Sequence, residues 1–139
     1  NCYLKLKKPS RAEAEKAAFF EIVNKLGLNP DMVRVSREPN YGCGGALGPA
    51  QFLPTTWLAY EDRVAELTGH RPPNPWNIED AFMASAIKLA VAGATAKTRA
   101  AEIGAAKAYI GGSTKCSSRI CNYYANAVLN KAAIIEQSL

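Results

Sequence analysis

The segment that decides the fold reads GALGPAQFLPTTW, residues 45–57. Four glycines fall between positions 42 and 48, and glycine allows close backbone approaches that any side chain would block. We interpret this part as a loop that faces a ligand. Pro54, which suits the first position of a helix, then opens a helical pattern that continues to Gly69.

The sequence on both sides of this segment is also helical in pattern, because apolar residues recur at steps of three and four positions. It contains no repeats, no low-complexity tracts and no convincing strand pairs. We therefore predict an all-α fold, a small domain whose alanine-rich helices pack closely. The predicted helices run from about residue 10 to 26, from Pro54 to Gly69, from Asn77 to Gly93, from Thr98 to Ile110, and from Ile120 to the end.

Three details of these helices can be compared directly with a structure. Ser10 and Glu13 have the spacing of a capping box at the start of the first helix, and Asn77 is placed to cap the third. Trp57 lies on the apolar face of the second helix and is predicted to be core rather than a platform for sugars. The buried side of the third helix is predicted to carry Ile78, Phe82, Ile87 and Leu89.

Length and composition favour one domain. With 139 residues, 48% of them hydrophobic and 21% charged, the chain can build one core, so residues 1–139 are predicted to form a single domain. The sequence begins at Asn1 and contains neither a signal peptide nor an apolar run that could span a bilayer. We interpret it as a processed or excised piece, and any membrane anchor would lie outside it.

The cysteines bear on the compartment. Four of them in so short a chain are compatible with two disulfides, Cys116 to Cys121 and Cys2 to Cys43, outside a reducing cytosol. The alternative is four reduced, buried cysteines. Because no pair is spaced C-x-x-C and His70 is the only histidine, a zinc site is hard to assemble.

The net charge of +5 and the pI near 9.1 allow a polyanionic partner. Nucleic acid is not predicted, because the basic residues are scattered and no basic run is accompanied by stacking aromatics. An anionic wall or membrane surface suits the charge equally well, and the simplest interpretation is a solubilising surface.

The glycine-rich segment closely resembles a motif of the lysozyme-like lytic transglycosylases. The membrane-bound lytic murein transglycosylase B type has the pattern G-A-M-G-x-x-Q-F-M-P-S-[ST]-[WY], against GALGPAQFLPTTW here. Further segments occur in the family's order: PWNIEDA (75–81), AKAYIGG (106–112) and NYYANAVL (122–129). The resemblance covers about residues 36–130. It implies a lysozyme-like domain, or that domain without one N-terminal helix, that binds peptidoglycan glycan strands.

The resemblance also implies a mechanism with one glutamate. That acid protonates the leaving oxygen between N-acetylmuramic acid and N-acetylglucosamine, then deprotonates a hydroxyl of the same muramyl sugar, which closes an anhydro ring. Glu38 is the candidate acid, since a glutamate shortly before the glycine-rich loop is usual in the lysozyme superfamily. In the transglycosylase B type the glutamate lies several tens of residues earlier, which here would precede Asn1. Otherwise Glu38 is an ordinary solvated loop carboxylate.

Three further residues are predicted to bind substrate. Gln51 matches the glutamine of the family motif and would hydrogen-bond the sugar. Tyr109 matches a tyrosine that holds the catalytic carboxylate, although the asparagine that follows it in the family is Ile110 here. An ordinary core tyrosine is an equally good interpretation of Tyr109. Tyr41, beside the glycines, could stack on a sugar face.

No cofactor or metal is predicted, because the segment between Asp62 and Asn74 lacks the aspartate-rich calcium loop of the transglycosylase B type. We expect a monomeric, extracytoplasmic lytic transglycosylase. The alternatives are a non-catalytic glycan-binding module, or a hydrolytic muramidase in which Glu61 or Asp62 activates water. A nucleic-acid or membrane-surface protein would rest on charge alone.

Overall fold

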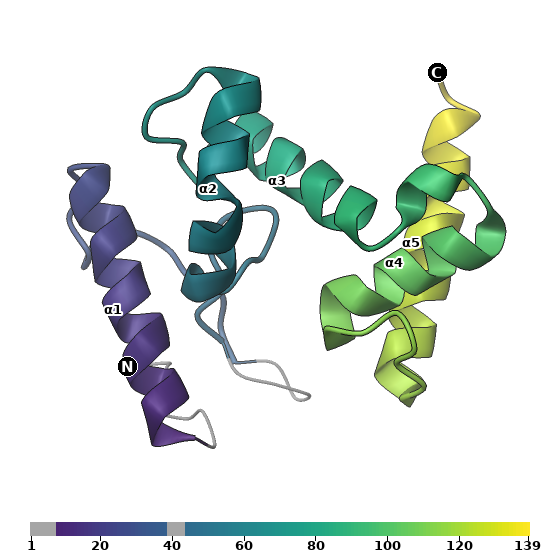
Figure 1. The fold of residues 1–139 in the computed structure, drawn as a ribbon, viewed down its shortest axis with the longest axis horizontal. Coiled ribbons are helices and arrows are strands. Elements are labelled where there is room, and N and C mark those ends of the chain that lie inside the picture. The colour runs from purple at the N-terminus through teal and green to yellow at the C-terminus, as the bar shows by residue number, and fades with distance from the viewer. Residues whose placement is uncertain (1–7, 39–43) are drawn as a thin grey trace. The chain divides into compact units, whose positions relative to one another are not determined.

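The protein is all-α, as predicted, in the computed structural model, which describes residues 8–38 and 44–139 (Figure 1). Within these ranges it forms five α-helices, one short 3-10 helix and no β-strand. Every predicted α-helix starts within one residue of its observed start. The elements are α1 (Pro9–Lys25), α2 (Pro54–Thr68), α3 (Ile78–Val91), η2 (Ala94–Ala96), α4 (Arg99–Gly111) and α5 (Arg119–Glu136).

The chain divides into two compact units, Asn1–Ser85 and Ala86–Leu139, and each is described by itself. In the first unit α1 packs against α2, and the segment between these two helices supplies core residues of its own. Trp57 is buried in this core, which confirms the prediction made for it. The largest buried apolar side chains of the unit are Ile22, Val23, Leu47, Phe52, Trp57 and Val64.

The start of α1 differs from the predicted capping box. The helix begins at Pro9, one residue before Ser10, and Lys8 is the N-cap without a side-chain hydrogen bond. The fixed backbone angle of a proline at the first position already suits a helix, and its missing N–H needs no partner there. Ser10 therefore lies inside the helix, where it cannot act as the cap.

Glu15 is an unexpected member of the core. It lies in the middle of α1 and is only 2% exposed. Its carboxylate accepts two hydrogen bonds from Thr55, one from the backbone N–H at 2.9 Å and one from the hydroxyl at 2.7 Å. Thr55 is the second residue of α2, so Glu15 binds one of the N–H groups that a helix start leaves without a partner. The contact ties α1 to the beginning of α2.

The predicted buried face of α3 is wrong at Ile78 and Phe82, whereas Ile87 and Leu89 are partly buried. Asp80, Ala81 and Ala84 are buried, whereas Ile78 and Phe82 are 54% and 66% exposed. The helix turns Asp80 inward because its carboxylate accepts hydrogen bonds from the preceding loop, and the small alanines on the same side then face the core. The predicted cap is confirmed, since the Asn77 side chain accepts the N–H groups of Glu79 and Asp80.

The second unit is built from α4 and α5, which pack against each other. Alanines from both helices are buried in their contact, as the alanine content predicts. Thr98 caps α4 and Ser118 caps α5, each by accepting a backbone N–H three residues later. The buried cluster consists of Ala106, Ala125 and Leu129, with Ile103 and Val128 packed at its edge.

We predict that Glu15→Leu lowers the free energy of unfolding by about 1–2 kcal/mol, because Thr55 loses both hydrogen bonds while the volume of the core is largely kept. Urea unfolding followed by circular dichroism measures the change. Glu13→Leu is the matched control, since Glu13 lies exposed on the same helix and should change stability by less than about 0.5 kcal/mol. Equal stability of the two variants would contradict the role given to Glu15.

Candidate functional site

The described part of the glycine-rich loop, from residue 44 onward, is bonded along its backbone to the segment that precedes it. The N–H of Ser36 donates to the carbonyl of Ala46 at 2.8 Å, and the N–H of Gly45 donates to the carbonyl of Ser36 at 2.9 Å. The Ser36 hydroxyl accepts the N–H of Ala46 at 3.0 Å. A hydroxyl and two backbone bonds thus hold the loop where it leaves Gly44.

Two glycines of the loop are required by close approach rather than by flexibility. A Cβ atom on Gly44 would lie 2.6 Å from the Ser36 carbonyl oxygen. A Cβ atom on Gly48 would lie 1.8 Å from the Pro75 carbonyl oxygen and 3.2 Å from the Cα of Trp76. The distances of 2.6 Å and 1.8 Å are far below van der Waals contact with backbone atoms that cannot easily move. The glycine-rich loop therefore packs directly on the segment before α3, residues 69–77 (GHRPPNPWN), which we call the proline-rich segment.

Gln51 occupies an unusual backbone conformation. Its φ angle is +56°, in the left-handed region that costs a residue with a side chain about 1–3 kcal/mol. Its side-chain amide donates to the Gly48 carbonyl at 2.7 Å, and its backbone N–H bonds the same carbonyl at 3.2 Å. Leu47 and Phe52 then pair across the turn, so the strain is held by buried neighbours on both sides. The exposed side chain of Gln51 is consequently fixed close to the loop backbone.

The proline-rich segment is organised by Asp80, which is 1% exposed. One carboxylate oxygen lies 2.7 Å from Nδ1 of His70, and the other accepts the N–H of Asn74 at 2.8 Å. The Asn74 side chain accepts the N–H of Trp76 at 2.9 Å, and the Trp76 indole N–H donates to the Arg34 carbonyl at 2.7 Å. A chain of hydrogen bonds thus runs from α3 to the segment before the glycines.

The predicted site residues lie in different places. Glu38 is exposed and is the last described residue before the glycines. Its backbone nitrogen lies 2.8 Å from the position that a Cβ atom on Gly44 would occupy. Gln51 lies in the same loop and Tyr41 falls outside the described residues. Tyr109 belongs to the second unit. The structure therefore brings Glu38 and Gln51 to one loop, and the role of each stays a prediction.

The Tyr109 ring is engaged within its own unit. It stacks on Tyr124 with ring centroids 6.4 Å apart and planes 17° apart. The Lys88 ammonium lies 4.6 Å from the ring centroid and 3.4 Å from the Tyr109 carbonyl oxygen. Burial lowers the pKa of Lys88 below its ordinary value, because desolvation disfavours the charged amine. These contacts fix the orientation of the Tyr109 ring in the second unit.

Two carboxylates are buried in the described part of the chain, Glu15 and Asp80, and both bind this chain's own donors. Sequence analysis missed both residues. Asp80 lies in the first turn of α3, where an acidic residue is ordinary, and the single histidine gives no sign of its partner. The same described residues contain no group of three or more histidine, cysteine, aspartate or glutamate side chains that could hold a metal ion.

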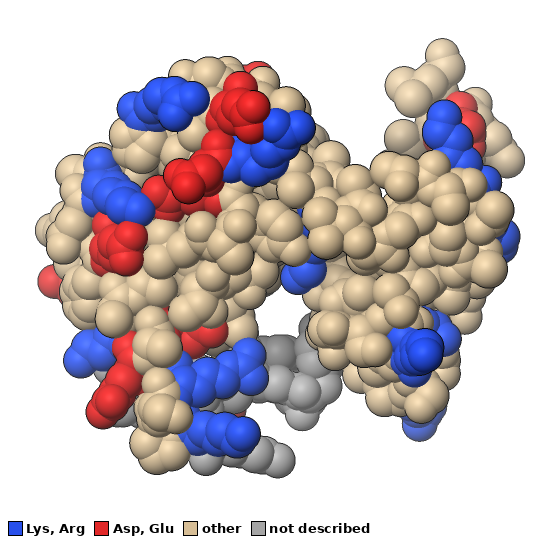
Figure 2. All heavy atoms as spheres, in the orientation of Figure 1, with Lys and Arg blue, Asp and Glu red and all other residues tan. Residues whose placement is uncertain are grey.

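The charges on the face shown in Figure 2 are mixed. Over the helices α1 and α2, the aspartate and glutamate side chains lie among those of lysine and arginine. Over α4 and α5 the basic side chains are separated by uncharged surface. Among the described residues on this face, neither unit by itself carries a continuous basic stripe of the kind that follows a nucleic-acid backbone.

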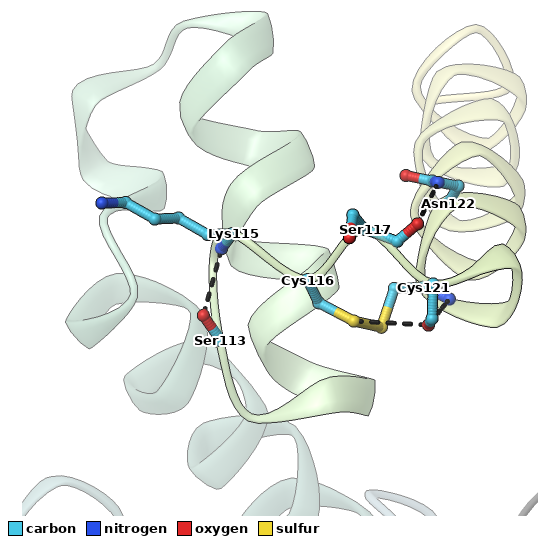
Figure 3. Close-up of a disulfide and its surroundings, with 7 residues drawn as sticks. Ser113, Lys115, Cys116, Ser117, Cys121 and Asn122 are labelled. Atoms are coloured by element: carbon cyan, nitrogen blue, oxygen red, sulfur yellow. Dashed lines mark hydrogen bonds between the residues drawn. A yellow bond between two sulfur atoms is a disulfide. The ribbon is translucent and has the colours of Figure 1, made fainter.

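Cys116 and Cys121 form a disulfide that closes the connection between α4 and α5, with Cα atoms 6.0 Å apart (Figure 3). The disulfide lies against Gly111, where a Cβ atom would be 2.5 Å from the sulfur of Cys121. This confirms one of the two predicted pairs, while Cys2 and Cys43 lie outside the described residues. Among the residues described, no helix has the length and apolar character needed to cross a bilayer.

Comparison of the chain with protein-family models, with curated proteins and with solved structures finds no match. The features that bear on function are therefore the contacts within the glycine-rich loop and the motif GALGPAQFLPTTW.

We predict that Gly48→Ala destabilises the first unit by more than 3 kcal/mol or prevents its folding, because the new methyl group would overlap the Pro75 carbonyl. Gly27→Ala is the matched control. Gly27 also has a positive φ, +63°, but nothing lies within 4 Å of its Cβ position, so only the strain of about 1 kcal/mol remains. Thermal unfolding of both variants measures the difference, and equal losses would contradict the close approach.

We predict that Cys116→Ser combined with Cys121→Ala lowers the free energy of unfolding by about 2 kcal/mol, the entropy expected for a short closed loop. Urea unfolding with and without reductant measures it. Reductant should destabilise the parent chain by at least the same amount. In the double variant, any further effect of reductant would report on Cys2 and Cys43. An undiminished stability of the variant would show that the disulfide does not support the α4–α5 connection.

Proposed function

We propose that this chain acts on peptidoglycan as a lytic transglycosylase, cleaving the bond between N-acetylmuramic acid and N-acetylglucosamine with formation of an anhydro ring. The observation that supports this most is the geometry of Gln51. An exposed, strained residue held by buried neighbours is typical of ligand-binding loops, where the strain positions a group in advance.

The loop suits a sugar ligand chemically. Gln51 uses its amide N–H₂ on the Gly48 carbonyl, so its side-chain oxygen is directed by a bond within the loop and can accept from a sugar hydroxyl. Rigid, directional polar groups of this kind distinguish one saccharide from another.

The acid in this proposal is Glu38, which adjoins the loop at Gly44. Its proton would go to the leaving glycosidic oxygen as the bond to the muramyl anomeric carbon breaks. The resulting carboxylate would then take the proton of a hydroxyl on the same muramyl residue, whose oxygen bonds the anomeric carbon. The muramyl hydroxyl takes the place of water as the nucleophile, so a second carboxylate to activate water is not required.

A non-catalytic glycan-binding module is the second candidate. It is favoured by the exposure of Glu38 and by the engagement of both buried carboxylates, Glu15 and Asp80, with this chain's own donors. A hydrolytic muramidase is less well supported at Glu61. That carboxylate is bound by Lys25 at 2.7 Å, and the hydrogen bonds of Glu21 and Glu61 raise the pKa of the Lys25 ammonium.

An extracytoplasmic location belongs to the same proposal. The Cys116–Cys121 disulfide supports it, because such bonds persist in oxidising compartments. The peptidoglycan that we propose as the substrate also lies outside the cytoplasm.

We predict that Glu38→Gln reduces turnover of purified peptidoglycan by roughly two to four orders of magnitude, because the amide keeps the shape but has no proton to transfer. Mass spectrometry of the released fragments measures turnover and separates anhydro products from hydrolysed ones. Glu136→Gln, at an exposed position in the second unit, is the control and should leave turnover unchanged.

Three outcomes decide between the candidates. Loss of turnover with retained glycan binding supports the transglycosylase and Glu38 as its acid. Glycan binding without turnover in the parent chain favours the binding module. Hydrolysed products would favour the muramidase, and normal turnover by Glu38→Gln would show that Glu38 is not the acid.

A further inference from the structure

The two tryptophans of the chain have opposite environments. Trp57 is 1% exposed, and its indole N–H has no hydrogen-bond partner among residues 8–38 and 44–139. Trp76 is half-buried, and its indole N–H donates to the Arg34 carbonyl at 2.7 Å. Trp57 therefore serves packing alone, whereas Trp76 presents part of a ring whose polar edge is already satisfied within the protein.

Two hydrogen bonds, one to its backbone and one to its ring, fix Trp76 in place. Its backbone N–H is fixed by the Asn74 side chain at 2.9 Å, and its indole nitrogen is fixed by the segment before the glycines. Asn74 is in turn bound through its own N–H to the buried Asp80 carboxylate. Because these bonds order the ring in advance, a ligand that contacts it does not lose free energy in ordering the side chain.

Trp76 and Gln51 flank the same glycine. The Cα of Trp76 lies 3.2 Å from the Cβ position of Gly48, and the carbonyl of Gly48 accepts the Gln51 amide at 2.7 Å. Outside residues 1–7 and 39–43, no other aromatic ring and no cation contacts the Trp76 ring. A partly exposed tryptophan and a fixed amide thus lie on either side of Gly48, and small-molecule sites use such a pair for apolar contact and orientation.

We propose that Trp76 is a stacking platform for a pyranose ring of the glycan strand, in one subsite with Gln51. The C–H face of an N-acetylhexosamine is apolar and lies flat on an indole, while the hydroxyl and N-acetyl groups at the ring edge reach the amide. The inference rests on the proposed function for its ligand class, but it requires binding only and is independent of which residue is the acid.

The experiment measures binding of soluble glycan strands stripped of their stem peptides. Acrylamide quenching of tryptophan fluorescence reports Trp76, since Trp57 is buried from the quencher. Saturation with strands should protect the parent chain from quenching, and this protection should be absent in Trp76→Phe, which keeps Trp57 as its only indole.

The second readout is the affinity of each variant for the glycan strands, measured by isothermal titration calorimetry. We expect Trp76→Ala to weaken binding by about fivefold to tenfold, and Trp76→Phe to restore part of the loss because a flat ring remains. Tyr123→Ala removes an aromatic ring that is 72% exposed on α5 and should leave affinity unchanged. Circular dichroism confirms that each variant is folded.

The outcomes separate this inference from the proposed function. Strand binding by the parent with undiminished affinity in Trp76→Ala would overturn the platform and leave the proposed function standing. No binding by the parent would overturn the proposed function, and the platform with it. If Trp76→Ala fails to fold, the quenching of the parent decides: protection by strands supports the platform, and its absence overturns it.

Discussion

The close packing of Gly48 on the Pro75 carbonyl is the constraint on which the candidate site depends. No side chain fits between these two backbones, so the glycine-rich loop and the proline-rich segment can meet only while residue 48 is glycine. That contact sets the turn in which Gln51 takes its left-handed conformation, and it places Trp76 beside the same turn. The local strain at Gln51 is thus maintained by packing between segments far apart in sequence.

Buried carboxylates fix the elements around this contact. Glu15 joins α1 to the first turn of α2, directly after the loop, and Asp80 joins α3 to the segment before it. A buried charge is tolerated only where hydrogen bonds replace the lost water, and each of these groups has two. In the first unit, therefore, the two buried acidic side chains act as structural connectors.

The second unit is stabilised differently. Its helices meet through small side chains such as Ala106 and Ala125, and a disulfide closes the connection between them. Tyr109 is fixed there by stacking and by the Lys88 ammonium. Its ring orientation is therefore set by the packing of this unit, whichever of its two interpretations holds, core residue or part of a catalytic site.

The sequence by itself determined the helices and their starts, because proline at position 54, asparagine at 77 and the glycines act on the backbone within one turn. It also indicated the Cys116–Cys121 pair and the burial of Trp57. Only the tertiary structure decided which face of α3 is buried and which carboxylates are engaged. Such choices depend on contacts outside the helix itself. Asp80 is turned inward, where it binds His70 and Asn74 of the preceding loop, and Phe82 is exposed although apolar periodicity favoured the reverse. Hydrogen-bond satisfaction of a buried charge outweighed the burial of one apolar ring, and local sequence carries no signal for that comparison.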